Sequence, residues 1–171
     1  ALREGDQART YRELDHRSRR VAHALASRGV RRGDRVAVMV PNSFEFFEAV
    51  HGSGRLGAVV VPVNIHFKAD EAGWIVTDSG AAAVVVAEDL QSALDGVTDV
   101  PRLVVGPGGD YEAALSNAPE QGEVEPPEIV GDGWPTIMAY TSGTTGRPKG
   151  VAIGEDDFRR RAVGVAASKD R

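Results

Sequence analysis

Two kinds of apolar pattern alternate along the first two thirds of the chain. Short runs such as Ala58–Val63 and Ala81–Ala87 are apolar at nearly every position, which is typical of strands buried on both faces of a parallel sheet. Between such runs lie longer segments in which apolar residues recur at helical spacing, as Leu14, Val21 and Leu25 do. That spacing places them on one face of a helix. The pattern therefore predicts an α/β fold.

Capping and turn residues locate the ends of these elements. Thr10 and Glu13 form a Thr-x-x-Glu capping box that opens the first helix, and Gly29 stands where a glycine would end it. Asn42 or Ser43 caps the second helix, which runs to about residue 56. Further helices are predicted over 68–78 and 90–94, and strands over 36–40, 58–63, 81–87, 102–105, 134–140 and 151–153.

Strands that alternate with helices of this length predict a Rossmann-like, mostly parallel sheet flanked by helices and joined by right-handed crossovers. We divide the chain into an α/β portion over 1–116 and a surface linker over 117–133, which is rich in Pro, Glu and Gly and lacks apolar periodicity. A strand–loop–strand unit follows over 134–153. A terminal helix over 154–171 begins with acidic residues, which suits the helix dipole.

Composition excludes several classes of function. The net charge of −5 argues against a nucleic-acid binder driven by bulk charge, and the Arg159–Arg161 triplet is interpreted as a solvated helix face. The absence of cysteine rules out disulfides and thiol nucleophiles, and four scattered histidines lack metal-ligand spacing, so no metal site is predicted. No apolar run approaches the length of a membrane span, and a cytoplasmic protein is expected.

Residues 141–150 read Thr-Ser-Gly-Thr-Thr-Gly-Arg-Pro-Lys-Gly and carry the clearest chemical signal. Glycines let backbone N–H groups approach an anion closely, hydroxyl groups add donors, and Lys149 adds a compact positive charge. These are the groups that hold a polyphosphate. A glycine- and threonine-rich hairpin loop without a ligand is the alternative interpretation, since most such loops bind nothing.

The spacing differs from that of a Walker loop, which needs G-x-x-x-x-G-K-[ST] leading into a helix. Gly143 and Gly146 are too close together, and Pro148 separates the loop glycines from Lys149. The residues that follow, Gly150–Ile153, predict a strand. An unrelated nucleotidase of the Walker type is therefore disfavoured, and a flexible strand–loop–strand phosphate clamp is expected.

The stretch Tyr140–Gly150 resembles the phosphate-binding signature of the adenylate-forming superfamily, which includes acyl-CoA synthetases, nonribosomal adenylation domains and luciferases. Every fixed position of that pattern, Y-T-S-G-T-T-G-x-P-K-G, is matched. The segments Thr10–Leu14, Gly33–Ala37, Pro41–Ser43 and Gly57–Asn64 resemble the N-terminal landmarks of the superfamily, in the same order.

Two further segments, Phe67–Glu71 and Asp78–Ala81, are similar to the acyl-CoA synthetase branch in particular, and the whole resemblance spans residues 8–153. It implies the first subdomain of the large N-terminal domain of an adenylate-forming enzyme, in truncated form. The stretch Asn64–Glu71 favours a fatty or other aliphatic acid as substrate.

The resemblance implies a reaction in two steps. A carboxylic acid attacks the α-phosphate of ATP, which gives an acyl-adenylate and pyrophosphate, and coenzyme A then displaces AMP to form a thioester. Mg²⁺ would come with ATP. By the same resemblance Lys149 is the catalytic residue. The residues that bind the ATP phosphates are Thr141, Ser142, Gly143, Thr144, Thr145, Gly146, Lys149 and Gly150.

Other parts that the resemblance implies are not found in these residues: the adenine and Mg²⁺ segment, the aspartate that binds ribose, the hinge and the C-terminal lysine. The stretch Gly154–Asp157 also departs from the superfamily pattern, and a start at Ala1 suggests a fragment. We therefore expect the N-terminal part of an ATP-dependent acyl-CoA synthetase that does not catalyse the reaction alone. The alternative is a non-catalytic remnant or interaction domain with at most weak nucleotide binding.

Overall fold

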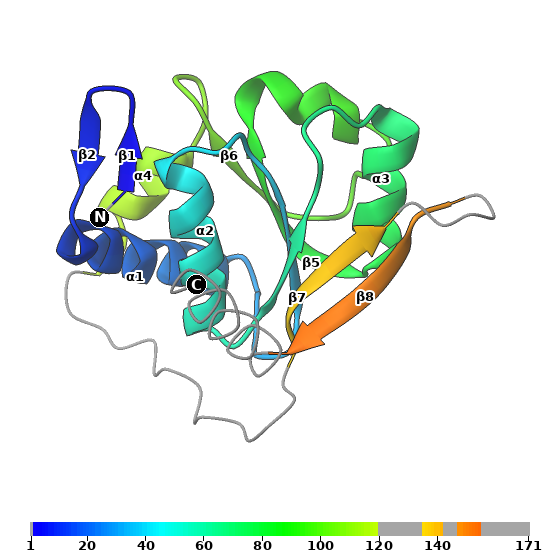
Figure 1. The fold of residues 1–171 in the computed structure, drawn as a ribbon, viewed down its shortest axis with the longest axis horizontal. Helices are drawn as coiled ribbons and strands as arrows, with labels where there is room; N and C mark the ends of the chain where they lie inside the picture. Colours follow the sequence, from blue (N-terminus) through cyan, green and yellow to red (C-terminus); the bar gives the residue numbers. More distant parts are fainter. Residues whose placement is uncertain (1, 120–134, 142–146, 155–171) are drawn as a thin grey trace, which may run out of the picture.

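A six-stranded sheet forms the centre of the protein in a computed structural model, which describes residues 2–119, 135–141 and 147–154 (Figure 1). The strand order is β6-β5-β3-β4-β7-β8, and every neighbouring pair is parallel except the antiparallel pair β7–β8. The strands are β3 (Arg35–Met39), β4 (Val59–Pro62), β5 (Ala81–Ala87), β6 (Arg102–Val105), β7 (Pro135–Thr141) and β8 (Lys149–Gly154). The predicted mostly parallel α/β sheet is confirmed.

Helices cover both faces of this sheet. They are α1 (Tyr11–Ser27), α2 (Phe44–Arg55), α3 (Ala69–Asp78), the 3₁₀ helix η1 (Glu88–Leu94) and α4 (Tyr111–Ser116). The chain steps from β3 to β4 in one direction and from β4 back across β3 to β5 in the other. Because parallel crossovers are right-handed, this reversal puts α2 and α3 on opposite faces. Helices α1 and α4 join α2, and η1 joins α3.

The side chains of the central strands alternate between two apolar cores. On β3, Val36 and Val38 enter the core beneath α1 and α2, whereas Ala37 and Met39 enter the core beneath α3. All four are 0–1 % exposed. This two-sided burial explains why the strands are apolar at almost every position.

Both predicted ends of α1 are confirmed. The backbone N–H of Thr10 donates to the Glu13 carboxylate at 2.7 Å, and Glu13 N–H donates to the Thr10 hydroxyl at 3.2 Å. At the other end Gly29 has φ +93°, Gly29 N–H bonds to the carbonyl of Ala26, and Val30 N–H bonds to that of Leu25. These two bonds form a Schellman motif.

Other predictions need correction. The helix expected over 90–94 is part of the 3₁₀ helix η1, a form common in short connections. Helix α4 and the hairpin of β1 (Leu2–Glu4) and β2 (Gln7–Arg9) were not predicted, since elements this short show little periodicity. Most of the linker expected over 117–133, together with residues 142–146 and the terminal helix beyond Gly154, lies outside the described residues.

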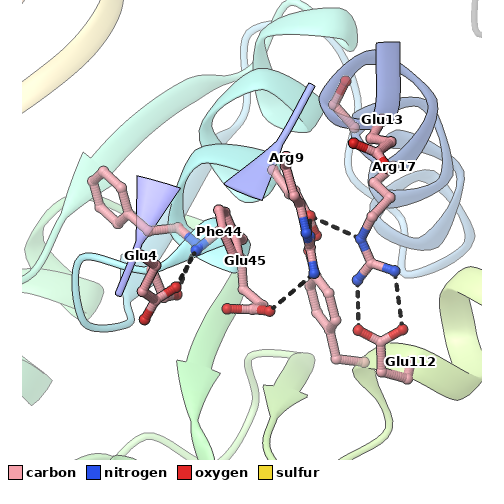
Figure 2. Close-up of polar contacts among 12 residues, drawn as sticks. Glu4, Arg9, Glu13, Arg17, Phe44, Glu45 and Glu112 are labelled. Carbon is pink, nitrogen blue, oxygen red and sulfur yellow. Dashed lines mark hydrogen bonds and ion pairs between the residues drawn. The ribbon is translucent and has the colours of Figure 1, made fainter. Parts of the chain in front are cut away.

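A buried carboxylate joins three of these elements to α2. The side chain of Glu48 is 0 % exposed, receives hydrogen bonds of 2.8 Å from Arg17 Nε and from the Tyr111 hydroxyl, and forms an ion pair with Arg9. The Arg17 guanidinium also reaches both carboxylate oxygens of Glu112, at 3.1 and 2.5 Å (Figure 2). The donors come from β2, α1 and α4, so this network fastens the N-terminal hairpin and α4 to the helical layer.

Candidate functional site

The ends of the predicted phosphate loop, Thr141 and Lys149, lie at the carboxyl edge of the parallel strands. Strand β7 runs parallel to β4, with Ile137 opposite Val60, so it ends at Thr141 on the edge where β3, β4 and β5 also end. In open α/β sheets, ligands bind outside this edge. The hairpin β7–β8 thus carries the predicted loop to the side of the sheet where a ligand is expected.

The pairing of β7 with β8 brings two predicted site residues together. Thr141 is opposite Lys149, and Tyr140 is opposite Gly150. Directly opposed residues of an antiparallel pair project from the same face, so the Thr141 hydroxyl and the Lys149 ammonium group stand on one side of the hairpin. Both residues are exposed. The side chains of Thr141 and Lys149 are therefore available to an anion; Ser142, Gly143, Thr144, Thr145 and Gly146 lie outside the described residues.

Gly150 has a packing role on the opposite face of the hairpin. A Cβ atom at this position would lie 3.1 Å from the Cε2 and Cζ atoms of Tyr140 and 3.2 Å from Cγ of Met138. A larger residue would therefore force the Tyr140 ring or the Met138 side chain to shift by a few tenths of an ångström. This contact seats the Tyr140 ring on the hairpin, directly before Thr141.

Tyr140 also ties β7 to the end of α3. Its hydroxyl donates a hydrogen bond of 2.7 Å to the Oδ2 atom of Asp78, the last residue of α3. Partial burial and this hydrogen bond raise the pKa of Tyr140 above its ordinary value. The phenol therefore stays protonated, and remains a donor to Asp78, throughout the physiological pH range.

Trp74 makes the corresponding contacts with the segment that leads into β8. The guanidinium carbon of Arg147 lies 4.2 Å from the centroid of the Trp74 ring, and the indole Nε1 donates to the Pro148 carbonyl at 3.4 Å. The Trp74 ring packs against the core beneath α3. Its contacts with Arg147 and Pro148 were missed, because no local pattern signals a contact between residues so far apart in the chain.

A cleft of about 670 Å³ opens beside these contacts, between α3, the segment after η1 and the base of the loop. Asp70 and Glu71 contribute negative charge to its wall, while Arg147 contributes positive charge and Trp74 an aromatic face. Within the described residues there is no group of three or more His, Asp or Glu side chains that could hold a metal ion. In the same part of the chain, no helix has the length and apolar character needed to cross a membrane.

The comparisons with known proteins agree with this geometry. The family model described as "AMP-binding enzyme" matches residues 1–170. The chain belongs to this family. It is 34% identical to the feruloyl-CoA synthase of Amycolatopsis sp over 99% of the chain, and 35% identical to the long-chain-fatty-acid–CoA ligase FadD13 of Mycobacterium tuberculosis over 96% of the chain. The resemblance to adenylate-forming enzymes is thereby confirmed.

The fold comparison leads to the same group of enzymes. The O-succinylbenzoate coenzyme A synthetase of Bacillus subtilis, solved in complex with AMP, matches with a TM-score of 0.82 and 30% identity over 97% of the chain. The chain covers 41% of that structure and 33% of the feruloyl-CoA synthase and FadD13 sequences. It therefore spans about a third of the length of these curated relatives.

Proposed function

We propose that this chain is the N-terminal part of an ATP-dependent acyl-CoA synthetase and holds the phosphates of ATP through residues 141–150. The pairing of exposed Thr141 with exposed Lys149 at the carboxyl edge of the sheet supports this proposal. In a member of the AMP-binding enzyme family, that edge is the expected side for a nucleotide.

The proposed chemistry places specific demands on the loop. A carboxylate oxygen of the acid attacks the α-phosphorus of ATP, the bond to the bridging oxygen breaks, and pyrophosphate leaves with the negative charge. Lys149 and the hydroxyl of Thr141, with the loop residues Ser142–Gly146 and Gly150, would neutralise and orient the β- and γ-phosphates. Coenzyme A would then displace AMP.

Mg²⁺ enters this proposal as a companion of ATP. The described residues contain no cluster of three metal-ligating side chains, and Mg²⁺ usually keeps water ligands and binds through substrate phosphates. The ion would neutralise phosphate charge when ATP is bound. The described residues Thr141 and Lys149 would contribute donors to the phosphates.

The proposal extends to the class of carboxylic acid that the whole enzyme activates. The resemblance of Asn64–Glu71 to the fatty acyl-CoA synthetase branch and the name of the FadD13 relative favour an aliphatic acid, whereas the name of the feruloyl-CoA synthase relative points to an aromatic one. We propose an aliphatic acid. A cytoplasmic location stays a prediction.

Direct binding tests the phosphate-binding role. In calorimetric titrations of the chain we expect Mg·ATP and pyrophosphate to compete for one site, and AMP to compete weakly. Replacing Lys149 by alanine removes a charge-assisted contact, which should weaken pyrophosphate binding about tenfold to a hundredfold. Lys68→Ala, which removes an exposed lysine elsewhere, is the matched control. Equal affinities for Lys149→Ala and the original chain would contradict the proposed role.

A second assay separates phosphate binding from catalysis. We expect the chain alone to give no ATP–pyrophosphate exchange with any carboxylic acid, because the ribose-binding aspartate and the C-terminal lysine that the family resemblance implies are not found among its residues. Measurable exchange would show that these elements are dispensable. Absence of pyrophosphate binding as well would favour the non-catalytic remnant.

A further inference from the structure

One side of helix α3 touches both ends of the phosphate loop. Trp74 and Asp78 are four residues apart, so their side chains project from the same side of the helix. Asp78 accepts the hydrogen bond of Tyr140 on β7, and Trp74 contacts Arg147 and Pro148 just before β8. The helix therefore holds both stems of the loop by separate side-chain contacts. The incoming stem is held at Tyr140, and the outgoing stem is held at Arg147 and Pro148.

The helix is itself firmly held. Ala72, Ile75 and Val76 are 0–1 % exposed and pack into the core beneath α3. The Ser79 N–H completes the helix by donating to the carbonyl of Ile75 at 3.0 Å. A side chain on such an element has a well-defined position, in contrast to one on a loop. Contacts with Trp74 and Asp78 therefore fix the loop stems relative to the core.

Each anchored residue is the chain neighbour of a residue proposed to bind phosphate. Tyr140 directly precedes Thr141, and Pro148 directly precedes Lys149. Ordering the groups that bind a ligand costs conformational entropy, and holding those groups in place beforehand lowers that cost. The contacts to α3 thus hold the residues directly before Thr141 and Lys149, the first and last side chains proposed to bind the phosphates.

Arg147 supplies the cation of the contact with Trp74. It stands at the one position that the phosphate-binding signature leaves unspecified, and its guanidinium lies over the Trp74 ring. Stacking of a guanidinium on an indole fixes both groups through a cation–π contact. The outgoing stem is therefore held by a pair of residues that the shared signature does not require.

We propose that Trp74 and Asp78 are positioning residues for ATP: they hold the strand ends that carry Thr141 and Lys149 in place against α3 and do not touch the ligand. The inference rests on the proposed function of the loop. It predicts that changes at Trp74 or Asp78 alter phosphate affinity although Thr141 and Lys149 themselves are unchanged.

A double-mutant cycle on ligand affinity tests the inference. Mg·ATP and inorganic pyrophosphate are titrated into the full chain carrying Asp78→Ala, Tyr140→Phe, or both. Each single change should weaken binding roughly tenfold, the effect of losing one hydrogen bond to a charged group, and the double variant should bind no more weakly than either. Lys68→Ala, which removes an exposed side chain directly before the same helix, is the control and should bind like the original chain.

The outgoing stem is tested by a graded pair of variants. Trp74→Phe keeps an aromatic face for Arg147 and loses only the indole donor, so it should retain part of the affinity that Trp74→Leu loses. A purely structural role would not give this graded rescue, and melting temperatures identify any variant that unfolds. Should Trp74→Leu or Asp78→Ala unfold, Trp74→Phe and Tyr140→Phe, which each lose one polar group, decide the matter.

The outcomes separate the two proposals. Failure of the original chain to bind pyrophosphate would overturn the proposed function and, with it, this inference. Binding by the original chain with unchanged affinity in the folded Trp74 and Asp78 variants would overturn the inference alone. Weakening that is additive in the double variant would show that Tyr140 and Asp78 act separately, and would also contradict it.

Discussion

Replacing Glu48 by alanine should destabilise the protein by about 3 kcal/mol. Its carboxylate is fully buried and is shared by Arg17, Tyr111 and Arg9. Removing one partner of a buried ion pair costs about 3–5 kcal/mol, since it leaves charge without compensation. We expect a loss near the lower end of this range because Arg17 keeps its contact with Glu112, and because the side chains of Arg9 and Arg17 are each 22% exposed.

Urea unfolding followed by circular dichroism measures this loss, which corresponds to a fall in melting temperature of about 6–12 °C for a chain of this size. Glu112→Ala, whose side chain is 65% exposed, is the control and should cost less than about 1 kcal/mol. Tyr111→Phe, which removes one donor to the carboxylate, should fall between the two. A Glu48→Ala variant within about 1 kcal/mol of the original would refute the view that this network fastens α1, α4 and the hairpin to α2.

Three further predictions concern α1 and its partner helix. Gly52→Ala should lower the free energy of unfolding in urea by about 1–3 kcal/mol, although alanine favours helices, because the new Cβ would lie 2.7 Å from Cβ of Val21. Equal or higher stability would contradict the close contact between α1 and α2. Gly29→Ala should cost about 1–2 kcal/mol, since φ is +93° there, and an unchanged transition midpoint would argue against the Schellman motif. Hydrogen bonds from Thr10 lower the pKa of Glu13 from 4.5, so the stability they confer is present above pH 4.5 and lost as the pH falls below it. Thermal melts of Thr10→Ala between pH 7 and pH 3 should therefore show a lower melting temperature at pH 7 and a weaker acid dependence than the original chain.

Local patterns predicted most of the fold because local physics determines those elements. The buried strand over 81–87 and the capped helix beginning at Thr10 each carry their signal within a few neighbouring residues. The same holds for the glycine that ends α1. The position of β7 beside β4 could not be derived in this way, because it depends on the pairing of strands far apart in the chain.

The burial of Glu48 and the role of Trp74 escaped sequence reasoning for related reasons. A glutamate on a helix is ordinarily solvated, and only the arrival of Arg9, Arg17 and Tyr111 from other elements makes its burial possible. Trp74 contacts Arg147 and Pro148 from a distant part of the chain, which no local pattern reveals. The predicted phosphate-binding string could be recognised because its residues are contiguous, whereas the contacts around it are distributed over α3, β7 and the start of β8.

Phosphorus-31 NMR of Mg·ATP in the presence of the chain tests the central claim most directly, since it resolves the three phosphates separately. The proposed clamp predicts that the β- and γ-phosphorus signals shift or broaden more than the α signal, and that Lys149→Ala abolishes this difference while Lys68→Ala preserves it. Signals that are unchanged by the original chain, or that respond equally in the chain and in Lys149→Ala, would contradict a phosphate-binding role for residues 141–150.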